Sequence, residues 1–416
     1  MFVVFILLIV SMLSKLVRSK LVLVGGGHSH SVALSSWLGQ QSLERSLTLL
    51  ELSDRPIADI TLITPSAQTI YSGSVPGHLA GWWNRGACAV NVAGLAASLG
   101  IKVILDEAIG LDLAQHPTQQ YVISRNHGPI AFDILSLDIG STPQIPAPPS
   151  QRIIPMKPMG LLLDSLEPYF QLGLSGDLFK KLSIAIVGGG LGGIEVALSL
   201  KERLRDQLDL SLICRSQTIA PTQSKGMQEV LNYELESRSI RVYLNTTVNA
   251  VQENTNGVNL ILNTGKYHSD LSCDLSLWAT EATAPQWIRD SGLMTDDRGF
   301  VLVDRTLRSV SHSNIFASGD IATLQNNPQP KAGVFAVRQG PIVAHNLQQT
   351  LANRSLQVFN SQSRYLSLVS LGDRRAVASY GKFSMTSKIL QPWFWDLKKT
   401  IDDGFVSGLN RSSDLH

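Results

Sequence analysis

Two glycine-rich turns, each following a short apolar run, constrain the fold of this chain more than any other feature. Gly25–His30 follows Leu21–Val24, and Gly188–Gly193, which keeps the full G-x-G-x-x-G spacing, follows Ile184–Val187. Glycines let the backbone turn sharply off a strand and let main-chain N–H groups of the next helix approach a pyrophosphate. One such pattern is weak, but its repetition predicts two dinucleotide-binding βαβ units. Two nucleotides held by one chain predict electron transfer, typically between a nicotinamide and a flavin.

The composition is that of a packed α/β protein. The chain has 416 residues, of which 44% are hydrophobic and 16% charged, and this length allows two or three domains. Its formal net charge of +2 gives no field that would attract nucleic acid. Its three cysteines, Cys88, Cys214 and Cys273, are far apart and include no C-x-x-C pair. A disulfide framework, a cysteine zinc site and a dithiol relay are therefore not expected.

The amino terminus carries an apolar run, Met1–Leu13, and basic residues follow it. A helix of this length reaches roughly 20 Å, which is less than the roughly 30 Å hydrocarbon core of a bilayer. A secretory signal normally has its positive charge before the apolar run rather than after it. We interpret the segment as an extension before the first domain or as a shallow interfacial anchor.

The helix after the first turn is expected to include Val32–Leu38. His28 and His30 lie at its start, where contact with a phosphate or with solvent is favoured over metal binding, so no metal site is predicted. Because His30 replaces the third glycine of the pattern, the helix is expected to lie farther than usual from the strand.

Two segments compete for the second strand. Asp59–Thr64 is favoured over Leu47–Glu51 because it is β-branched and ends at a proline turn. This choice places Thr64 where a ribose-binding carboxylate is usual, and it makes residues 39–57 an extended helix or an insertion. Farther along, Ile70–Trp83 is either a surface turn or a loop folded over a planar ring.

The second half repeats the plan of the first. A strand at Phe132–Ile139 closes the first unit at Gly140, and a proline-rich linker follows. Beyond the second turn, the strand Leu210–Cys214 is followed by Arg215 instead of an acid. An arginine there can pair with a 2′-phosphate and so favour NADPH, although a solvated arginine is the alternative.

The carboxyl-terminal region predicts an amphipathic aromatic helix. Apolar side chains recur at helical spacing and charges occupy the other side. The stripe is formed by Trp393, Phe394, Leu397, Ile401 and Phe405. Such a stripe is typical of a core or dimer contact, and its aromatic residues beside two lysines favour a membrane interface equally.

In combination, these segments resemble the two-dinucleotide-binding-domain flavoproteins, including the type II NADH dehydrogenases. Within them, the chain is most similar to the NADH-dehydrogenase-like flavoprotein module fused to selenide, water dikinase. The segments that carry this resemblance are Leu21–His30, Tyr71–Gly77, Leu135–Pro143, Trp287–Thr323, Lys331–Pro341 and Ser370–Arg374.

The resemblance implies an α/β fold of two interleaved Rossmann-like domains plus a small C-terminal region. The FAD-binding domain would comprise residues 20–150 and 295–350, and the NAD(P)H-binding domain residues 151–294. Residues 1–19 and 351–416 would form the N-terminal segment and the C-terminal region.

The resemblance also assigns cofactor contacts. FAD would be held by Gly25, Gly27, the N–H groups of His28 and Ser29, Thr64, Tyr71, Pro76, Gly140, Gly319, Asp320, Gly333 and Val334. NAD(P)H would be held by Gly188, Gly190, Gly193, Arg215 and Glu281. The candidate catalytic residues are Glu195, Lys331 and Gln339, although an ordinary helix position is the alternative for Glu195.

Two positions depart from the pattern of type II dehydrogenases. Glu281 stands where an Ala-Thr-Gly motif would have its glycine. Gly333-Val334 stands where an Ala-Gln pair would face the quinone, with Gln339 the nearest amide.

The implied activity is that of an FAD-dependent NAD(P)H dehydrogenase that passes electrons to an acceptor, most plausibly a membrane quinone. The alternatives are a selenium or sulfur acceptor and a non-catalytic redox sensor. The expected location is cytoplasmic, with peripheral contact to the inner face of a membrane, and a homodimer is compatible with the apolar tail.

Overall fold

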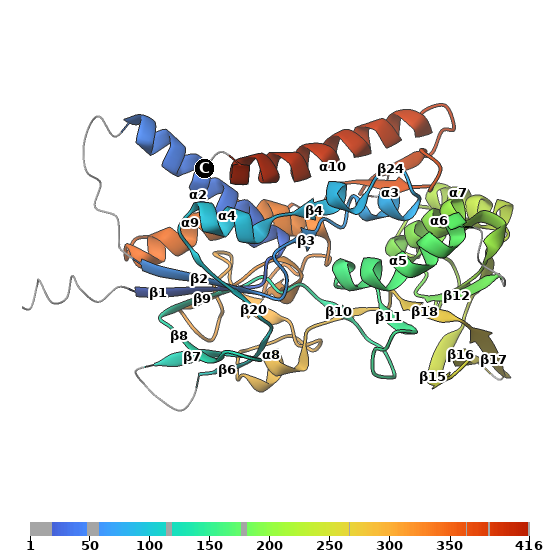
Figure 1. Ribbon diagram of the computed structural model, residues 1–416, viewed down its shortest axis with the longest axis horizontal. Helices are drawn as coiled ribbons and strands as arrows, with labels where there is room; N and C mark the ends of the chain where they lie inside the picture. The colour runs from blue at the N-terminus through green and yellow to red at the C-terminus, as the bar shows by residue number, and fades with distance from the viewer. Residues whose placement is uncertain are drawn as a thin grey trace, which may run out of the picture.

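The computed structural model describes residues 19–47, 58–113, 119–175, 181–265, 267–362, 364–381 and 383–414. Over these residues the chain is built on two five-stranded parallel sheets, with helices packed against them (Figure 1). The apolar run Met1–Leu13 and most of the alternative strand Leu47–Glu51 lie outside the described residues. In the residues that the structure describes, no helix is both long and apolar enough to span a bilayer.

The first sheet has the glycine strand at its centre. Its order is β21-β9-β1-β2-β5, and all neighbouring pairs are parallel. Its strands are β1 (Ser19–Val24), β2 (Ala58–Thr64), β5 (Lys102–Leu105), β9 (Ile134–Leu137) and β21 (Ile315–Ala317). The position of β2 confirms the favoured second strand. The helix after β1, α2 (His28–Leu47), continues beyond Val32–Leu38, in agreement with the extended-helix alternative for residues 39–57.

The second sheet repeats this arrangement, with order β11-β18-β12-β13-β14. Its strands are β11 (Ile153–Pro155), β12 (Leu182–Val187), β13 (Leu208–Ile213), β14 (Arg241–Tyr243) and β18 (Leu275–Trp278). The helices α6 (Leu191–Leu204) and α7 (Lys225–Ser237) follow β12 and β13. The glycine strand, β12, is again central, which confirms the predicted duplication.

Each unit also carries a three-stranded antiparallel sheet at the same point of the repeat. In the first unit it comprises β6 (Ala108–Asp112), β7 (Gln120–Ser124) and β8 (Gly128–Phe132). In the second it comprises β15 (Thr247–Asn254), β16 (Gly257–Thr264) and β17 (Tyr267–Cys273). Both sheets are inserted before the strand that returns to the parallel sheet, namely β9 or β18.

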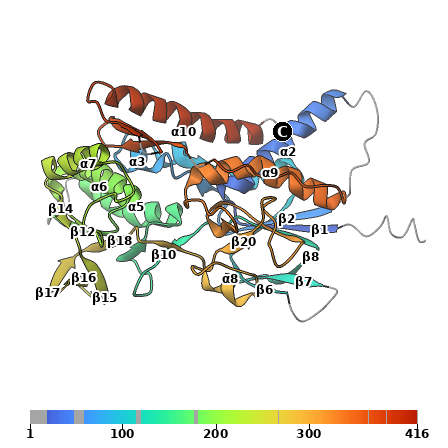
Figure 2. The same cartoon turned by 180° about the vertical axis from the view of Figure 1, so that it is seen from behind.

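The chain crosses between the units twice. The two crossing segments pair with each other as the short antiparallel strands β10 (Thr142–Pro143) and β19 (Ala282–Thr283). After the second crossing, β21 adds to the first sheet, and α9 (Gly333–Leu351) packs against α2 (Figures 1 and 2). The fold is therefore two Rossmann-like domains, the first of which includes late segments of the chain.

The remaining elements are short or peripheral. The helices are α3 (Val75–Leu79), α4 (Val92–Ser98), α5 (Met159–Ser175) and α8 (Gln286–Asp290), with 3-10 turns η1 (Arg85–Cys88), η2 (Arg205–Gln207) and η3 (Gly319–Ile321). The strands are β3 (Thr69–Ile70), β4 (Ala89–Val90), β20 (Val301–Val303) and β22 (Ala322–Leu324).

The C-terminal region is a three-stranded antiparallel sheet followed by a long helix. Its elements are β23 (Leu366–Ser370), β24 (Ala376–Tyr380), β25 (Phe383–Met385) and α10 (Gln391–Asp414). Helix α10 contacts α2, α4 and β24, and lies along one side of the molecule (Figure 1). The helix was predicted, but its apolar stripe was not correctly placed.

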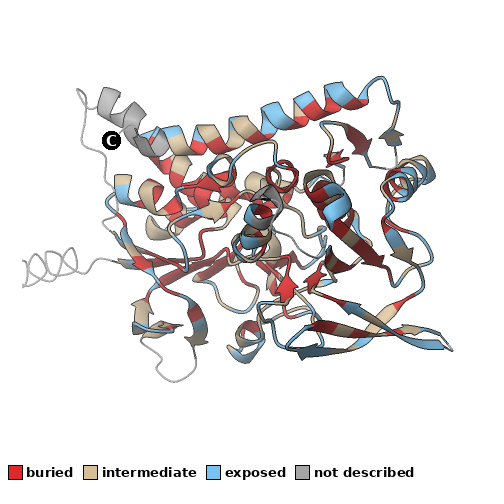
Figure 3. Ribbon diagram, turned by 45° about the vertical axis from the view of Figure 1, so that its right-hand side comes forward, coloured by how far each residue is buried: buried red, intermediate tan, exposed pale blue. Residues whose placement is uncertain are grey.

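The buried face of α10 is rotated relative to the prediction. Its buried positions include Phe394, Trp395, Lys398, Asp402 and Val406, whereas Trp393 and Ile401 are exposed (Figure 3 shows the alternation). The apolar pattern alone could not show this, because two charged residues are part of the buried face.

The tight second turn supplies a test of the fold. A Cβ atom at Gly193 would lie 2.1 Å from the carbonyl oxygen of Gly188, whereas a Cβ at the adjacent Gly192 would meet no atom within 4 Å. We expect Gly193→Ala to lower the free energy of unfolding by about 2 kcal/mol or more. Gly192→Ala should leave it unchanged or raise it by up to about 1 kcal/mol. Urea unfolding of both variants measures the difference, and equal stabilities would contradict this packing.

Candidate functional site

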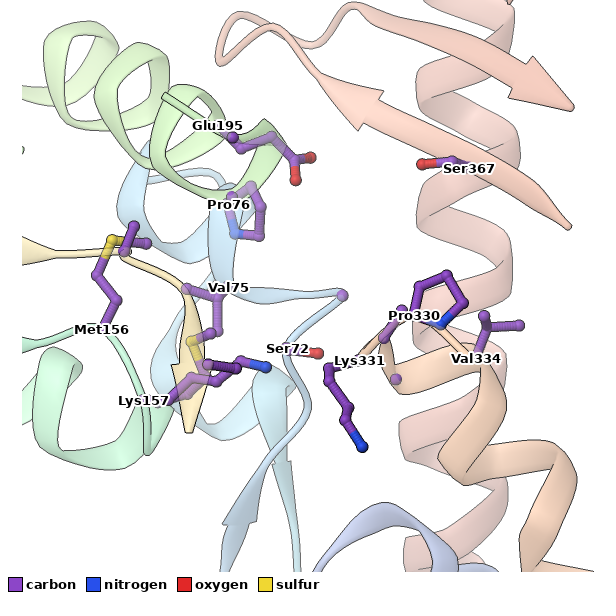
Figure 4. A pocket seen from close by; sticks show the side chains of 18 of the residues that line it. Ser72, Val75, Pro76, Met156, Lys157, Glu195, Pro330, Lys331, Val334 and Ser367 are labelled. Carbon is purple, nitrogen blue, oxygen red and sulfur yellow. The ribbon is translucent and has the colours of Figure 1, made fainter. Parts of the chain in front are cut away.

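One cavity of about 1010 Å³ lies at the carboxyl ends of the second sheet's strands. Its walls come from β11, β18, the start of α6, the Tyr71–Pro76 loop, the Pro330–Val334 segment and the C-terminal region. Figure 4 shows Glu195 entering from α6, Lys157 and Lys331 from other segments, and Ser367 from β23. Parallel α/β folds commonly bind ligands at this edge.

The second glycine turn opens into this cavity. Gly188 has φ +129°, and a Cβ there would lie 2.3 Å from the carbonyl oxygen of Ala279, so the turn requires glycine. Gly190 caps α6 at its N-terminus, and both Gly190 and Gly193 line the cavity. The helix start therefore faces open space, as a phosphate-binding turn requires.

Glu195 lies one turn into α6 and lines the same cavity. Its Oε1 atom accepts a hydrogen bond from the Ser370 N–H at 2.8 Å. Burial raises the pKa of Glu195, while Lys398 acts in the opposite direction. The structure thus places this predicted residue at the cavity, where a hydrogen bond links its carboxyl group to β23.

The Tyr71–Pro76 loop forms another wall and is not a surface turn. It continues into α3, whose five residues are all buried. The Tyr71 ring packs against His28 and Phe405, with ring centroids 5.3 Å and 4.5 Å away. Gly333 and Val334 also line the cavity, and Gly333 adjoins this loop, because a Cβ at Gly333 would lie 3.4 Å from Ser72 Oγ.

The first glycine turn differs from the second because a carboxylate occupies its helix start. Asp138, directly after β9, accepts hydrogen bonds from the His30 N–H at 2.8 Å and from the Ser29 N–H. A Cβ at Gly27 would lie 2.4 Å from the Asp138 carboxyl carbon. Burial raises the pKa of Asp138 to about 7, and the nearby charge of Asp320 adds to this effect. The sequence analysis did not single out Asp138.

His30 is a core residue, which corrects the prediction of a phosphate-contacting or solvated histidine. It is fully buried, and its two ring nitrogens lie 2.7 Å from Gly25 O and 2.8 Å from Ser136 Oγ. Desolvation lowers its pKa to about 4, so the ring is neutral at pH 7. The imidazole joins the first turn to β9 and occupies the space that a third glycine would leave.

Asp320 is held in a small polar cluster. Its Oδ2 atom lies 2.6 Å from Lys157 Nζ and 3.0 Å from Ser141 Oγ. Burial alone would raise the pKa of Asp320, but the Lys157 ammonium group and the Ser141 hydroxyl outweigh it, and the pKa is lowered. Lys157 lines the cavity and was not found from the sequence.

Lys331 also lines the cavity, beside Asp320. Its ammonium group donates to Ala322 O at 2.6 Å and to Thr323 Oγ1 at 2.9 Å, and lies 3.9 Å from the Phe300 ring centroid. Desolvation lowers the pKa of Lys331 to about 8.

Eleven of the predicted site residues do not line the cavity, namely Gly25, Gly27, His28, Ser29, Thr64, Gly140, Gly188, Arg215, Gly319, Asp320 and Gln339. Gln339 is buried, and its Oε1 atom accepts the Gly319 N–H at 2.6 Å, so its amide supports the Gly319 turn instead of facing an acceptor. The Thr64 hydroxyl donates to Ser66 O within its own turn. Gly140 has φ +74° at the end of the first unit. The position of Gln339 therefore corrects its predicted catalytic role.

Charged residues surround the part of the cavity next to the second glycine turn. Glu281 and Arg298 line it, and Arg215 follows β13 with its side chain 79% exposed. Glu281 lies 3.7 Å from Arg215 and 3.4 Å from Arg298. The Glu281 carboxylate therefore holds two arginines near the second glycine turn.

Helix α10 contributes a buried ion pair that the sequence analysis placed on the solvent side. Lys398 Nζ donates to Asp402 Oδ2 at 2.9 Å and to Gly73 O at 2.7 Å, and both side chains line the cavity. The i, i+4 spacing of the two charges was visible in the sequence, but the adjacent pair Lys399 and Asp403 has the same spacing.

The cysteines are unsuited to a thiol relay. All three are buried and unpaired, and burial raises the pKa of Cys88 and Cys214 to about 11 and that of Cys273 to about 12. Their thiols are therefore protonated and poorly nucleophilic at pH 7.

The residues around the first turn fit a flavin dinucleotide. Nε2 of His28 and Oγ of Ser318 are buried without a hydrogen-bond partner among the described residues. Both belong to segments expected to contact FAD, and an adjoining ligand would satisfy them. The cavity volume is at the upper end of the roughly 300–1,000 Å³ typical of ligand sites, which suits two stacked rings.

Two glycine-turn units in one chain, the second of which opens into the cavity, are the arrangement of a two-dinucleotide-binding-domain protein. The chain matches the family model described as "Pyridine nucleotide-disulphide oxidoreductase" over residues 59–340. The chain belongs to this family, whose cofactors are FAD and, as electron donor, NAD(P)H.

Individual relatives are distant. The chain is 28% identical over 237 residues to demethylphylloquinone reductase NdbB of Synechocystis sp., covering 55% of this chain and 56% of the relative. It is 27% identical over 227 residues to the type II NADH:quinone oxidoreductase of Haemophilus influenzae, covering 50% and 49%. The chain thus matches about half the length of these curated relatives.

A solved structure shares the fold along the whole chain. It is NDH2 from Plasmodium falciparum in complex with NADH, with a TM-score of 0.69 and 13% identity, covering 96% of this chain and 99% of that one. The resemblance to the module fused to selenide, water dikinase stays a prediction.

The buried carboxyl group of Asp138 makes stability depend on pH. Because its folded pKa of about 7 exceeds the ordinary value of 3.8, the folded protein binds an extra proton between these values, and stability falls as pH rises from about 4 to 7. Asp138→Asn keeps an acceptor for the two N–H groups and removes the titration. We expect the variant to be more stable than the parent at pH 8 by about 2–4 kcal/mol.

Urea unfolding at pH 5 and pH 8, on parent and variant with equal FAD content, measures this difference. The difference in the free energy of unfolding between the two proteins should be smaller at pH 5 than at pH 8. An equal pH dependence in both would show that Asp138 does not titrate in this range.

Proposed function

We propose that the protein is an NAD(P)H:quinone oxidoreductase that uses FAD. The observation that carries this proposal is the cavity, which has a phosphate-binding turn on one side and an apolar, partly exposed rim on the other. FAD, when bound, supplies the two-electron relay between donor and acceptor. The protein's own residues bind and orient the two substrates.

The donor side is the second glycine turn. Gly190 and Gly193 would hold the pyrophosphate at the start of α6, and Glu195 would face the nicotinamide end. On the flavin side, Tyr71, Pro76, Gly333 and the Asp320 cluster would hold the ring and the ribityl chain. Lys331 places a positive charge at this end of the cavity.

The acceptor side is the rim formed by β23 and α10. Leu366, Ile401 and Phe405 line the cavity there, and Leu366 and Ile401 are exposed. More exposed apolar side chains follow in the same region, at Phe383, Ile389 and Trp393. An apolar entrance of this kind suits a hydrophobic quinone and peripheral contact with a membrane surface. The names of the relatives, which include quinone reductases, support the same acceptor.

The direct test is anaerobic mixing of the FAD-loaded protein with NADH or NADPH, followed by a soluble quinone. We expect loss of flavin absorbance on mixing with the nicotinamide and its return on adding the quinone, because both rings would occupy the same cavity. Flavin reduction that a quinone does not reverse would exclude the quinone as acceptor. A flavin that neither nicotinamide reduces would contradict the whole proposal.

Donor preference is tested at Arg215. If this exposed guanidinium pairs with the 2′-phosphate, Arg215→Ala should raise the KM for NADPH about tenfold and leave the KM for NADH nearly unchanged, since a charge-assisted hydrogen bond contributes about 1.5 kcal/mol or more. Arg241→Ala is the matched control, because Arg241 is also exposed and ion-paired, with Asp209 on β13. Equal effects on the two donors would show that Arg215 does not recognise the 2′-phosphate.

A further inference from the structure

The buried charges of α10 form a connected chain with Tyr71. The Tyr71 hydroxyl donates to the Asp402 carboxylate. The same carboxylate accepts from Lys398, whose ammonium group also binds the Gly73 carbonyl oxygen. Lys398 and Asp402 are 7% and 4% exposed. All three side chains line the cavity on the wall next to the apolar rim.

A purely structural role does not explain this arrangement well. A buried ion pair gains little net stability over apolar side chains of similar size, because desolvating both charges offsets their attraction. The neighbouring pair Lys399 and Asp403 has the same i, i+4 spacing but points outward, with side chains 50% and 44% exposed. Of these two pairs on α10, only the buried one faces the cavity.

The proposed reaction requires a proton from the protein. NAD(P)H delivers a hydride, which carries two electrons and one proton, whereas reduction of a quinone to a quinol takes two electrons and two protons. One proton for each turnover therefore enters from solvent and must reach a cavity that is otherwise largely apolar on this side. A positioned hydroxyl or carboxyl group supplies such protons in many active sites.

We propose that Tyr71, Asp402 and Lys398 form the proton-delivery chain to the acceptor oxygen. This inference rests on the proposed function. In the transfer, the Tyr71 O–H bond breaks as an O–H bond forms on the acceptor. The Lys398 ammonium group gives a proton to the Asp402 carboxylate, Asp402 passes it to the phenolate oxygen of Tyr71, and the Lys398 amine then takes a proton from solvent. Tyr71 is the catalytic residue, and Asp402 and Lys398 are positioning residues that also resupply the proton.

The environment of each group agrees with this order of transfer. Burial and the Asp402 charge raise the pKa of Tyr71, so the hydroxyl is protonated at pH 7 and has a proton to give. Burial raises the pKa of Asp402 against the opposing effect of Lys398, which helps the carboxylate to accept a proton transiently.

The test compares an acceptor that takes protons with one that does not. A soluble quinone takes two electrons and two protons, whereas ferricyanide takes single electrons and no proton. We expect Asp402→Asn and Tyr71→Phe each to lower the ratio of kcat with the quinone to kcat with ferricyanide about tenfold or more, in line with the roughly 10²–10⁴-fold effect of general acid catalysis. Asp403→Asn is the matched control and should keep the parent ratio.

Two variants are compared so that a folding defect cannot be mistaken for a loss of proton delivery. Asp402→Asn leaves Lys398 buried without its counter-charge, but Tyr71→Phe keeps the ion pair and removes only the hydroxyl. Flavin content and circular dichroism check that each variant is folded and loaded. A folded Tyr71→Phe protein with an unchanged ratio would overturn the proton-delivery chain and leave the proposed function intact. A parent protein that reduces ferricyanide but no quinone would instead overturn the proposed function.

Discussion

The structure depends on the close approach of each glycine turn to the end of the neighbouring strand. A Cβ atom at Gly25 would lie 2.3 Å from the Asp138 carbonyl oxygen, and one at Gly188 would lie 2.3 Å from the Ala279 carbonyl oxygen. A side chain at either position would therefore push the central strand away from its neighbour. The two contacts are equivalent in the duplicated sheets, and they place the start of α2 and the start of α6 in the same relation to their sheets.

The two turns nevertheless have different electrostatic surroundings. Ala279 leaves the start of α6 open to the cavity, whereas Asp138, at the equivalent position, places a carboxylate on the N–H groups at the start of α2. A pyrophosphate at the first turn would thus have a buried titratable group as its neighbour. Helix dipoles stabilise anions at both turns, but only the first already has a carboxyl group at its helix start.

Helix α10 forms one wall of the cavity and adds both charged and apolar side chains to it. Without α10 the wall beside Tyr71 and Gly73 would be open, since Lys398 and Asp402 contact this loop directly. The helix brings a buried ion pair and an apolar rim to the same place. This combination suits an acceptor that is hydrophobic but must be protonated when it is reduced.

The amino-acid sequence by itself determined the duplicated fold and the location of the cavity walls. Glycine turns after apolar strands have a local steric cause, so Gly188–Gly193 and the favoured strand Asp59–Thr64 were predicted from the residues alone. Glu195, Tyr71 and Gly333 were brought to the cavity as the family resemblance implied. The glycine turns and the strand could be predicted because they depend on backbone geometry near each residue, whereas the cofactor roles of Glu195, Tyr71 and Gly333 stay predictions.

Only the tertiary structure decided which polar groups are buried and which groups they contact. His30 was expected to contact a phosphate or solvent, yet its ring pairs with Gly25 and Ser136 in the core. Gln339 supports Gly319 instead of facing an acceptor, and the buried face of α10 includes Lys398 and Asp402. The physical reason is that a charged side chain is buried only where a partner compensates its desolvation. Those partners, such as Tyr71 and Gly73 for α10, lie more than three hundred residues away in the chain.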